Sequence, residues 1–319
     1  DFGIGEVINE RGYLLLMCNN QETAAQQTLE AAIKGGGIGI ERVTPSEAQK
    51  LQPGVRHDDD TIYLWEKGAL QCDPMLLTQT LNRLARSSGV EIIENCQVDD
   101  LIISNNKIVG VQADGERMEA ENVFVATSNL GQPLLARYGI DVPVYPHRVE
   151  MAFFHVPVSG AFSLARCVSD SKSLIYLRPE VGNQIFVGWR EGDIVKNLDD
   201  LESVDPENYK QTMNNATLKK MRQSVLTTCP EMKDGFVHRT YACVYDWTDD
   251  EMPILDGNDT IKGLYFTLGN SGGGLSLSAA MGNLMADFIV DEKKSPDIEM
   301  VRLSRFAEGQ PIDWHNTSR

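Results

Sequence analysis

The chain has 319 residues, of which 42% are hydrophobic and 24% are charged. These proportions are typical of a soluble globular protein with one large domain or two interleaved domains. A net charge of −17 argues against a nucleic acid or an anionic membrane surface as the partner. No apolar run approaches the roughly 20 residues that span a bilayer, so we expect no transmembrane segment.

The six cysteines are far apart in the sequence, and none forms a C-x-x-C pair or lies near a histidine pair. This spacing gives neither a disulfide framework nor a zinc motif. The five histidines likewise show no pairing that suggests a triad or a metal site. We therefore expect reduced thiols, no bound metal and a cytoplasmic location, with no signal-like start at Asp1.

Hydrophobic periodicity predicts alternating strands and helices in the first half of the chain. Asp73 followed by Pro74 is typical of a helix start, and the Asn105-Asn106 pair predicts a hairpin turn. In chain order, we predict a strand at 11–17, helices at 21–34, 44–51 and about 73–88, and strands at 89–94, 97–103, 107–112 and 123–127.

From residue 143 the pattern changes to longer, alternating strands, which favours an antiparallel sheet. The predicted elements of this half are strands at 150–156, 173–177, 184–189, 236–244 and 264–268, and helices at 205–229, from about 275, and at 281–291. Pieces with α/β character therefore flank an antiparallel block, which predicts two domains that are discontinuous in sequence.

Three consecutive glycines, Gly272, Gly273 and Gly274, separate the strand at 264–268 from a helix. Glycine adopts positive φ freely and lets a backbone approach a ligand closely. The unpaired N–H groups of a helix start would then face that ligand with partial positive charge. On these residues alone, a plain strand-to-helix connection is an equal alternative. The other glycine triplet, at 35–37, lacks the context of a nucleotide loop and suits a helix end.

Four separated motifs occur in a characteristic order. They are Gly68-Ala-Leu-Gln-Cys-Asp-Pro; Val123-Phe-Val-Ala-Thr-Ser with Pro143-Val-Tyr-Pro-His-Arg; Tyr176-Leu-Arg-Pro-Glu; and Cys243-Val-Tyr-Asp-Trp with Gly263-Leu-Tyr and Gly269-Asn-Ser-Gly-Gly-Gly. Together they resemble the FAD-dependent amine and amino-acid oxidoreductases of the D-amino-acid oxidase superfamily. The resemblance is to sarcosine oxidase, dimethylglycine dehydrogenase and the proline dehydrogenase β-subunit, and it extends from about residue 12 to 290.

The resemblance implies a mixed α/β fold with a Rossmann-like FAD-binding domain and an inserted antiparallel-sheet substrate domain. The FAD-binding domain is expected at 68–143 and 236–295, and the substrate domain at 1–67 and 144–235. The implied activity is oxidation of the C–N bond of a small secondary amine or amino acid, similar to sarcosine, glycine or proline, by hydride transfer to flavin N5.

Two departures from the family pattern change this expectation. The G-x-G-x-x-G turn that holds the FAD pyrophosphate does not occur in the sequence, so the FAD-binding domain is expected to be N-terminally incomplete. Another chain or segment would complete it, and the alternative is a non-catalytic fragment or partner subunit of such an enzyme. Ser276 stands where sarcosine oxidases carry a lysine that promotes reaction with oxygen. This favours a dehydrogenase with another, unknown electron acceptor.

The resemblance also implies roles for individual residues. Tyr176 and Arg178 share a strand face that would cover the flavin and bind a substrate carboxylate, with an ordinary surface pair as the alternative. Tyr245 would lie at the substrate. The implied cofactor-binding residues are Val98, Ala126, Thr127, Cys243, Gly272, Gly273, Gly274, Leu275 and Ser276. For Cys243 the two readings are covalent attachment of the flavin and a free buried thiol; for Val98 the alternative is a core valine.

Overall fold

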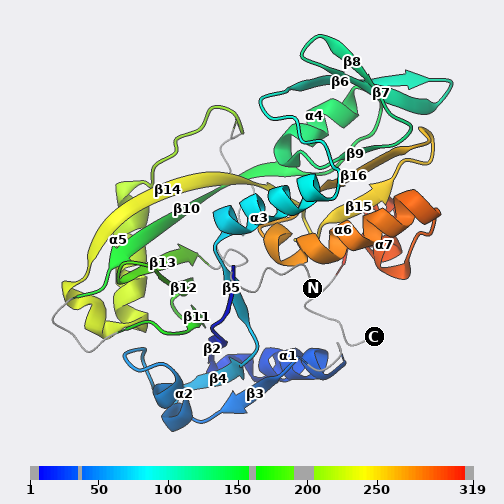
Figure 1. Ribbon diagram of the computed structural model, residues 1–319. Coiled ribbons are helices and arrows are strands. Elements are labelled where there is room, and N and C mark those ends of the chain that lie inside the picture. Colours follow the sequence, from blue (N-terminus) through cyan, green and yellow to red (C-terminus); the bar gives the residue numbers. More distant parts are fainter. Residues whose placement is uncertain (1–6, 35–37, 158–162, 190–204, 313–319) are drawn as a thin grey trace.

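A mixed α/β arrangement built on one large sheet dominates the computed structural model, which describes residues 7–34, 38–157, 163–189 and 205–312 (Figure 1). The large sheet has eight strands in the order β14-β10-β13-β12-β11-β2-β4-β3. All neighbours are antiparallel except β11 and β2, which run parallel. Its strands are β2 (Tyr13–Cys18), β3 (Ile40–Val43), β4 (Thr61–Glu66), β10 (Tyr145–His155), β11 (Cys167–Asp170), β12 (Ile175–Glu180), β13 (Gln184–Trp189) and β14 (Phe236–Trp247).

The two faces of the large sheet differ because side chains alternate along each strand. One face carries the main hydrophobic core, in which Phe154 and Val187 pack against Met221 and Val225 of helix α5 (Asn215–Thr228). Helix α2 (Pro45–Leu51) joins this core through the buried Ala48. The opposite face of β10, β13 and β14 is aromatic. It is described with the candidate site below.

Three smaller sheets complete the structure. Strand β1 (Ile8–Glu10) pairs with β5 (Leu70–Cys72), and β6 (Val98–Ser104), β7 (Lys107–Ala113) and β8 (Glu116–Glu119) form a meander. The third sheet has the order β15-β16-β9, from β15 (Ile254–Gly257), β16 (Leu264–Leu268) and β9 (Val123–Val125), with β16 and β9 parallel.

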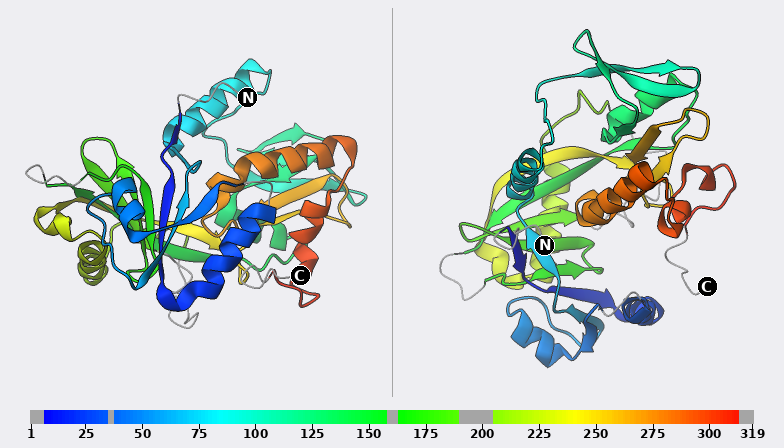
Figure 2. Two further views of the ribbon diagram at one scale, coloured as in Figure 1. Left: turned by 90° about the horizontal axis from the view of Figure 1, so that it is seen from below. Right: turned by 45° about the vertical axis from the view of Figure 1, so that its right-hand side comes forward.

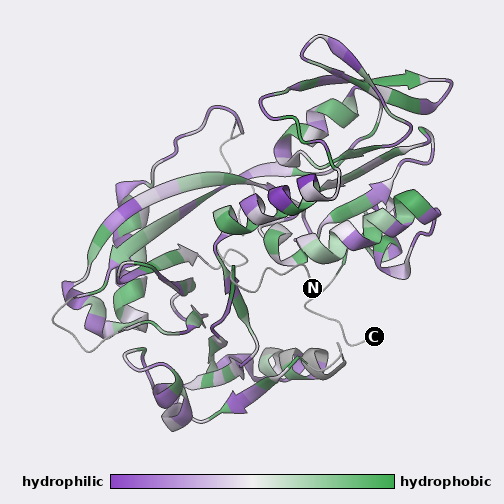
Figure 3. Cartoon of the chain, in the orientation of Figure 1, coloured by the Kyte–Doolittle hydropathy of each residue, from purple (hydrophilic) through white to green (hydrophobic). Residues whose placement is uncertain are grey.

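The remaining helices are α1 (Glu22–Lys34), α3 (Pro74–Ser87), α4 (Gly131–Ala136), α6 (Gly274–Asp291) and α7 (Pro296–Met300). Helices α6 and α7 pack on the third sheet through Leu255, Met285 and Ile298. Helix α3 projects from the rest of the described chain (Figure 2) and carries both hydrophilic and hydrophobic residues along its length (Figure 3). Within the described residues, no helix is long and apolar enough to cross a membrane.

Local sequence signals explain several boundaries. Thr44 caps α2, because its side chain accepts the N–H of Glu47 while Glu47 accepts the N–H of Thr44, a reciprocal capping box. The carboxylate of Asp73 caps α3 through the N–H groups of Met75 and Leu76. Asn105 and Asn106 both have positive φ (49° and 58°), as a tight hairpin turn between β6 and β7 requires.

Four expected elements differ from the structure. The strand expected at 89–94 is not a strand, because none of the described strands lies beside this segment to form a ladder with it. The helix expected at 205–229 begins only at Asn215, since Glu150 accepts the N–H of Asn214 and residues 205–214 form turns. The helices expected from 275 and at 281–291 are one helix, α6. Seven strands of the structure were not predicted, namely β1, β3, β4, β5, β8, β11 and β15.

The two-domain division stays a proposal. The pairing of β14 with the large sheet changes the boundary that we expected at residue 236. Residues 236–247 were expected with the FAD-binding domain, but β14 pairs with β10 over its whole length from Phe236 to Trp247. A strand that shares this long ladder belongs to the large sheet. The third sheet resumes only at Ile254, so we now place the boundary between Trp247 and Ile254.

Candidate functional site

The glycine turn connects β16 to α6 through three residues with positive φ, two of which are glycines. Gly269, Ser271 and Gly272 have φ values of 70°, 45° and 79°. The N–H of Gly273 donates to the carbonyl of Asn270 at 2.7 Å, which closes the turn immediately before the helix. Among the residues that the structure describes, no side chain caps the start of α6, so its first N–H groups have neither an intrahelical nor a side-chain acceptor there.

Asp246 holds this turn in place from the neighbouring strand β14. Its Oδ2 accepts the N–H of Gly269 at 2.8 Å, and its carbonyl accepts the N–H of Ser271 at 2.9 Å. Burial raises the pKa of Asp246, although hydrogen bonds from the backbone oppose the rise. The sequence prediction missed this residue. The sequence pattern that could have identified Asp246 is an aspartate between two aromatic residues of a strand. A carboxylate buried there needs a specific hydrogen-bond partner.

Tyr245 is packed directly against the turn that Asp246 holds. A Cβ placed on Gly272 would lie 2.9 Å from Cε2 of Tyr245, so any larger residue there would displace the ring. Cys243 lies on the same face of β14 as Tyr245 because the two are separated by one residue. The structure therefore brings together three of the predicted elements: the glycine turn, Tyr245 and Cys243.

Tyr176 and Arg178 lie on the aromatic face of the large sheet, where β12 meets β13. The ring of Tyr176 occupies the space beside Gly188: a Cβ on that glycine would lie 2.3 Å from Cζ of the tyrosine. The Arg178 guanidinium stacks 4.2 Å from the ring centre of Phe186, and its Nε donates to Glu180 at 2.7 Å. This hydrogen bond uses Nε and does not occupy the two Nη groups.

Two further residues of the aromatic face were missed from the sequence. Tyr241 lies near the ring of Phe186, with 6.3 Å between the ring centres. Burial raises the pKa of Tyr241, with Cys243 adding to the rise and Arg178 and Arg239 opposing it. Arg239 lies 4.0 Å from the ring centre of Phe153. The sequence could have identified both residues, because every second residue of a strand lies on the same face, and Tyr241 and Arg239 are at such positions relative to Tyr245.

The other predicted cofactor residues are exposed and lie on different elements. Val98 belongs to β6 and is 44% exposed, whereas Leu275, 48% exposed, and Ser276 begin α6. Ala126 and Thr127 follow β9 and are also exposed. The exposure of Val98 does not match a core valine among the described residues, and its contact with the cofactor stays a prediction. Ser276 donates its hydroxyl to the carbonyl of Gly273 at 2.9 Å.

No cluster of histidine, cysteine, aspartate or glutamate side chains suited to a metal ion occurs in the part of the chain that the structure describes. All six cysteines are free thiols. The candidate site is thus built from backbone dipoles, aromatic rings and guanidinium groups. Such a set can bind a planar electron-rich group and a carboxylate.

Comparison with protein families gives a match over nearly the whole chain. Residues 2–288 match the family described as FAD dependent oxidoreductase (DAO). The chain is 21% identical over 303 residues to the glycine oxidase of Geobacillus kaustophilus, covering 95% of this chain and 76% of that protein. It is 27% identical over 273 residues to the bifunctional protein ThiO/ThiG of Trichormus variabilis, covering 84% of this chain.

The chain spans only 38% of the length of that ThiO/ThiG protein and 41% of its counterpart from Nostoc. Among solved structures, L-proline dehydrogenase from P. horikoshii superimposes with a TM-score of 0.84 at 22% identity, covering 96% of this chain and 79% of that one. Glycine oxidase from Geobacillus kaustophilus gives a TM-score of 0.76 at 21% identity, covering 94% and 77%. These two similarities support the mixed α/β fold.

Proposed function

The chain belongs to the family of FAD-dependent oxidoreductases, and on this premise we propose that it oxidises the C–N bond of a small secondary amine or amino acid. One observation carries the proposal: Tyr245, on the aromatic face, packs against Gly272, at the start of α6. The glycine turn is suited to bind a flavin ring, and the aromatic face of the large sheet is suited to bind an amino acid. This contact places the two next to each other.

The glycine turn fits the polar edge of a flavin. The start of α6 has no side-chain cap, and Oδ1 of Asn270 beside it is buried without a hydrogen-bond partner in the described chain. A ligand with both acceptor and donor atoms, such as the flavin N1–C2=O and N3–H edge, would satisfy these groups. A side chain on Gly272 would displace the ring of Tyr245, which packs against this turn. The residues present therefore fit FAD at this position.

When bound, FAD supplies the acceptor for the electron pair and hydrogen that leave the carbon next to the amine nitrogen. The start of α6 would stabilise negative charge at the ring through its free N–H groups and the helix dipole. Gly272, Gly273, Gly274 and Leu275 provide this backbone. Ser276 adds only a neutral hydroxyl that is already bonded to Gly273. We therefore propose an electron acceptor other than oxygen.

Arg178 is the proposed partner for the carboxylate of an amino-acid substrate. A guanidinium presents two parallel N–H donors that match a carboxylate. The ion pair of Arg178 with Glu180 offsets part of its charge but uses Nε, so among the described residues no hydrogen bond occupies its two Nη groups. Tyr176, Tyr241 and Tyr245 would line the same pocket and exclude water around the amine. Exclusion of water favours the neutral amine, which is the form that gives up hydride.

A single preparation tests the proposal. Purified protein is incubated with FAD, freed of excess cofactor, and assayed with sarcosine, glycine and proline, using a redox dye to report electron transfer. We expect visible flavin absorbance and substrate-dependent reduction of the dye. Flavin absorbance without turnover of any amine would disprove the activity, and protein that stays colourless after FAD addition would disprove cofactor binding by this chain.

A non-catalytic subunit or fragment is the second candidate, and the edge of the third sheet favours it. Strand β9 pairs only with β16 within the described residues, and its Phe124 is 39% exposed. A strand edge with an exposed aromatic residue is suited to pairing with a further strand. If the second candidate holds, FAD binding will require another polypeptide segment, and addition of that segment will restore the flavin absorbance.

A further inference from the structure

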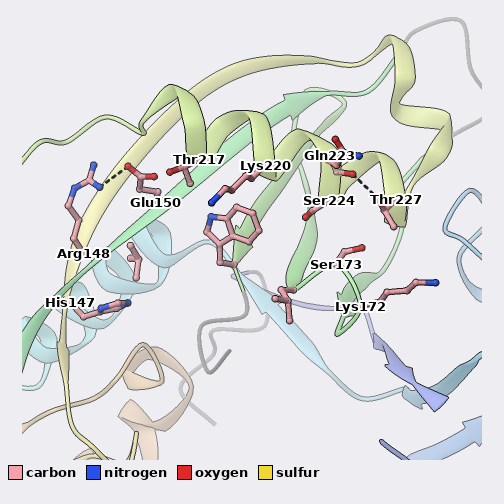
Figure 4. Close-up of a pocket in the computed structure, with 13 residues that line it drawn as sticks. His147, Arg148, Glu150, Lys172, Ser173, Thr217, Lys220, Gln223, Ser224 and Thr227 are labelled. Atoms are coloured by element: carbon pink, nitrogen blue, oxygen red, sulfur yellow. Dashed lines mark hydrogen bonds and ion pairs between the residues drawn. The ribbon is translucent and has the colours of Figure 1, made fainter. Parts of the chain in front are cut away.

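A cavity of about 570 Å³ lies between helix α5 and the large sheet, beside β10 (Figure 4). Strand β10 pairs with β13 from Ala152 to His155, so among the described residues its earlier part has no neighbouring strand on that side. The cavity occupies this gap and is closed by Trp189, by the turn before β12 and by α5. Its volume is in the range of sites that bind small organic molecules.

Most of the cavity wall comes from α5 and from the turn before β12, on the face of the sheet opposite the aromatic rings. Val149 of β10 also lines the cavity, and it packs with Cys243 and Tyr245 of the aromatic face, so the cavity adjoins the candidate active site at this residue. Met221 and Val225 of α5 pack with Phe154 and Val187, whereas Phe153 and Phe186 face Tyr241 and Tyr176. None of the residues predicted to bind FAD or the substrate lines the cavity. A ligand here would therefore be additional to the proposed cofactor and substrate.

The charge of the cavity wall comes mainly from one lysine. Arg148 is neutralised by Glu150 at 2.7 Å and also donates to the carbonyls of Lys210 and Thr212. The amino group of Lys172 points away from the cavity centre in Figure 4. Lys220 makes no salt bridge with any described residue, and both Lys220 and Trp189 line the cavity. One unpaired positive charge thus shares the wall with an aromatic side chain.

Polar groups on the wall have unmet hydrogen-bonding capacity. Oγ of Ser173 is buried and has no hydrogen-bond partner in the described chain, and Ser173 itself is only 8% exposed. Burial of such a group without a partner is unfavourable. Rotation of the Ser173 hydroxyl toward a ligand acceptor would remove that cost. The hydroxyl of Ser224, on α5, also lies on the wall.

We propose that this cavity binds a small organic monoanion, specifically a carboxylate attached to a planar ring. The ring would lie against Trp189 and Leu174, and the carboxylate would meet Lys220 and the hydroxyls of Ser173 and Ser224. A single unpaired lysine balances one negative charge, and the chain as a whole carries −17. A dianionic phosphate would be less well matched for both reasons.

Calorimetric titration of the whole protein with indole-3-acetate tests the proposal, with tryptamine as the cationic analogue of similar shape. We expect indole-3-acetate to bind and tryptamine not to bind. Lys220→Gln should weaken binding by about threefold to tenfold, the range of a partly exposed ion pair. Lys219→Gln is the matched control, because this neighbouring lysine is exposed like Lys220 but does not line the cavity.

Two further variants separate the cavity from other sites. Ser224→Phe would fill the cavity and should abolish binding, while thermal unfolding verifies that the variant is folded. Arg178→Met, in the proposed active site, should leave binding unchanged. Equal affinity of Lys220→Gln and the native protein, loss of binding in Arg178→Met, or tighter binding of phenyl phosphate than of indole-3-acetate would each overturn the proposal.

Discussion

Gly272 and the ring of Tyr245 are packed so closely that a β-carbon on the glycine would lie 2.9 Å from Cε2 and 3.2 Å from Cδ2 of the tyrosine. The glycine also has a φ of 79°, which a residue with a side chain rarely adopts. Position 272 therefore requires glycine for two independent reasons. This contact fixes the distance between the start of α6 and strand β14.

Gly272→Ala should lower the free energy of unfolding by about 1–3 kcal/mol, because it adds backbone strain and displaces Tyr245. Gly273→Ala is the control, since Gly273 has a φ of −84° and the nearest atom to an added Cβ lies at 3.4 Å. Denaturant titrations of both variants measure the difference. Equal stability of the two variants would contradict the close packing at Gly272.

Arg178→Met should reduce kcat/KM for amino-acid substrates by about 10- to 100-fold, because the proposed charged hydrogen bonds to the substrate carboxylate are lost. Amines without a carboxylate should be affected much less. Arg239→Met provides a comparison, since Arg239 is a second guanidinium stacked on the same aromatic face. A similar loss for amines with and without a carboxylate would disprove the assigned role of Arg178.

Ser276→Lys should raise the ratio of peroxide formation to dye reduction by about tenfold or more, because a fixed positive charge stabilises reduced oxygen species. Ser276 is exposed at the first turn of α6, so a lysine fits there without burial. Ser278→Lys, two residues further along the helix and also exposed, is the control. An unchanged ratio in Ser276→Lys would remove the reason for assigning an acceptor other than oxygen.

Asp250→Asn should destabilise the fold by about 3 kcal/mol or more at neutral pH, since it leaves Arg305 buried without its partner. Arg305 is fully buried, and its Nε and Nη2 donate to the two oxygens of Asp250 at 2.8 and 2.9 Å. Asp249→Asn, at the neighbouring exposed aspartate, should change stability little. Urea titrations compare the two variants.

The same ion pair predicts a pH dependence. Burial opposes the ionisation of Asp250, but hydrogen bonds from Arg305 and the backbone outweigh it and lower the pKa of Asp250. The stabilisation is therefore complete above the ordinary aspartate pKa and is lost as pH falls through the lowered value. The native protein should lose stability below about pH 4, and Asp250→Asn should lose less. Parallel pH profiles for both would contradict this origin.

The sequence determined the local elements and the family. The alternation of β10, β12 and β13, the helix start at Asp73 and the Asn105-Asn106 turn depend on short-range chemistry and were predicted. The order of four weak motifs indicated the FAD-dependent oxidoreductases. Elements whose formation depends on a distant neighbour were predicted less well. The segment at 89–94 has the composition of a strand, but none of the described strands lies beside it. Strand β14 belongs to the large sheet because it pairs with β10.

Only the tertiary structure decided which predicted site residues meet. The contact of Gly272 with Tyr245, the anchoring of the turn by Asp246, and the position of Arg239 and Tyr241 beside Arg178 arise from pairing between strands far apart in sequence. The same pairing leaves the cavity beside β10 where β13 ends. Local propensities act within a few residues, whereas these contacts depend on register and packing across the whole sheet, which a single sequence does not encode locally.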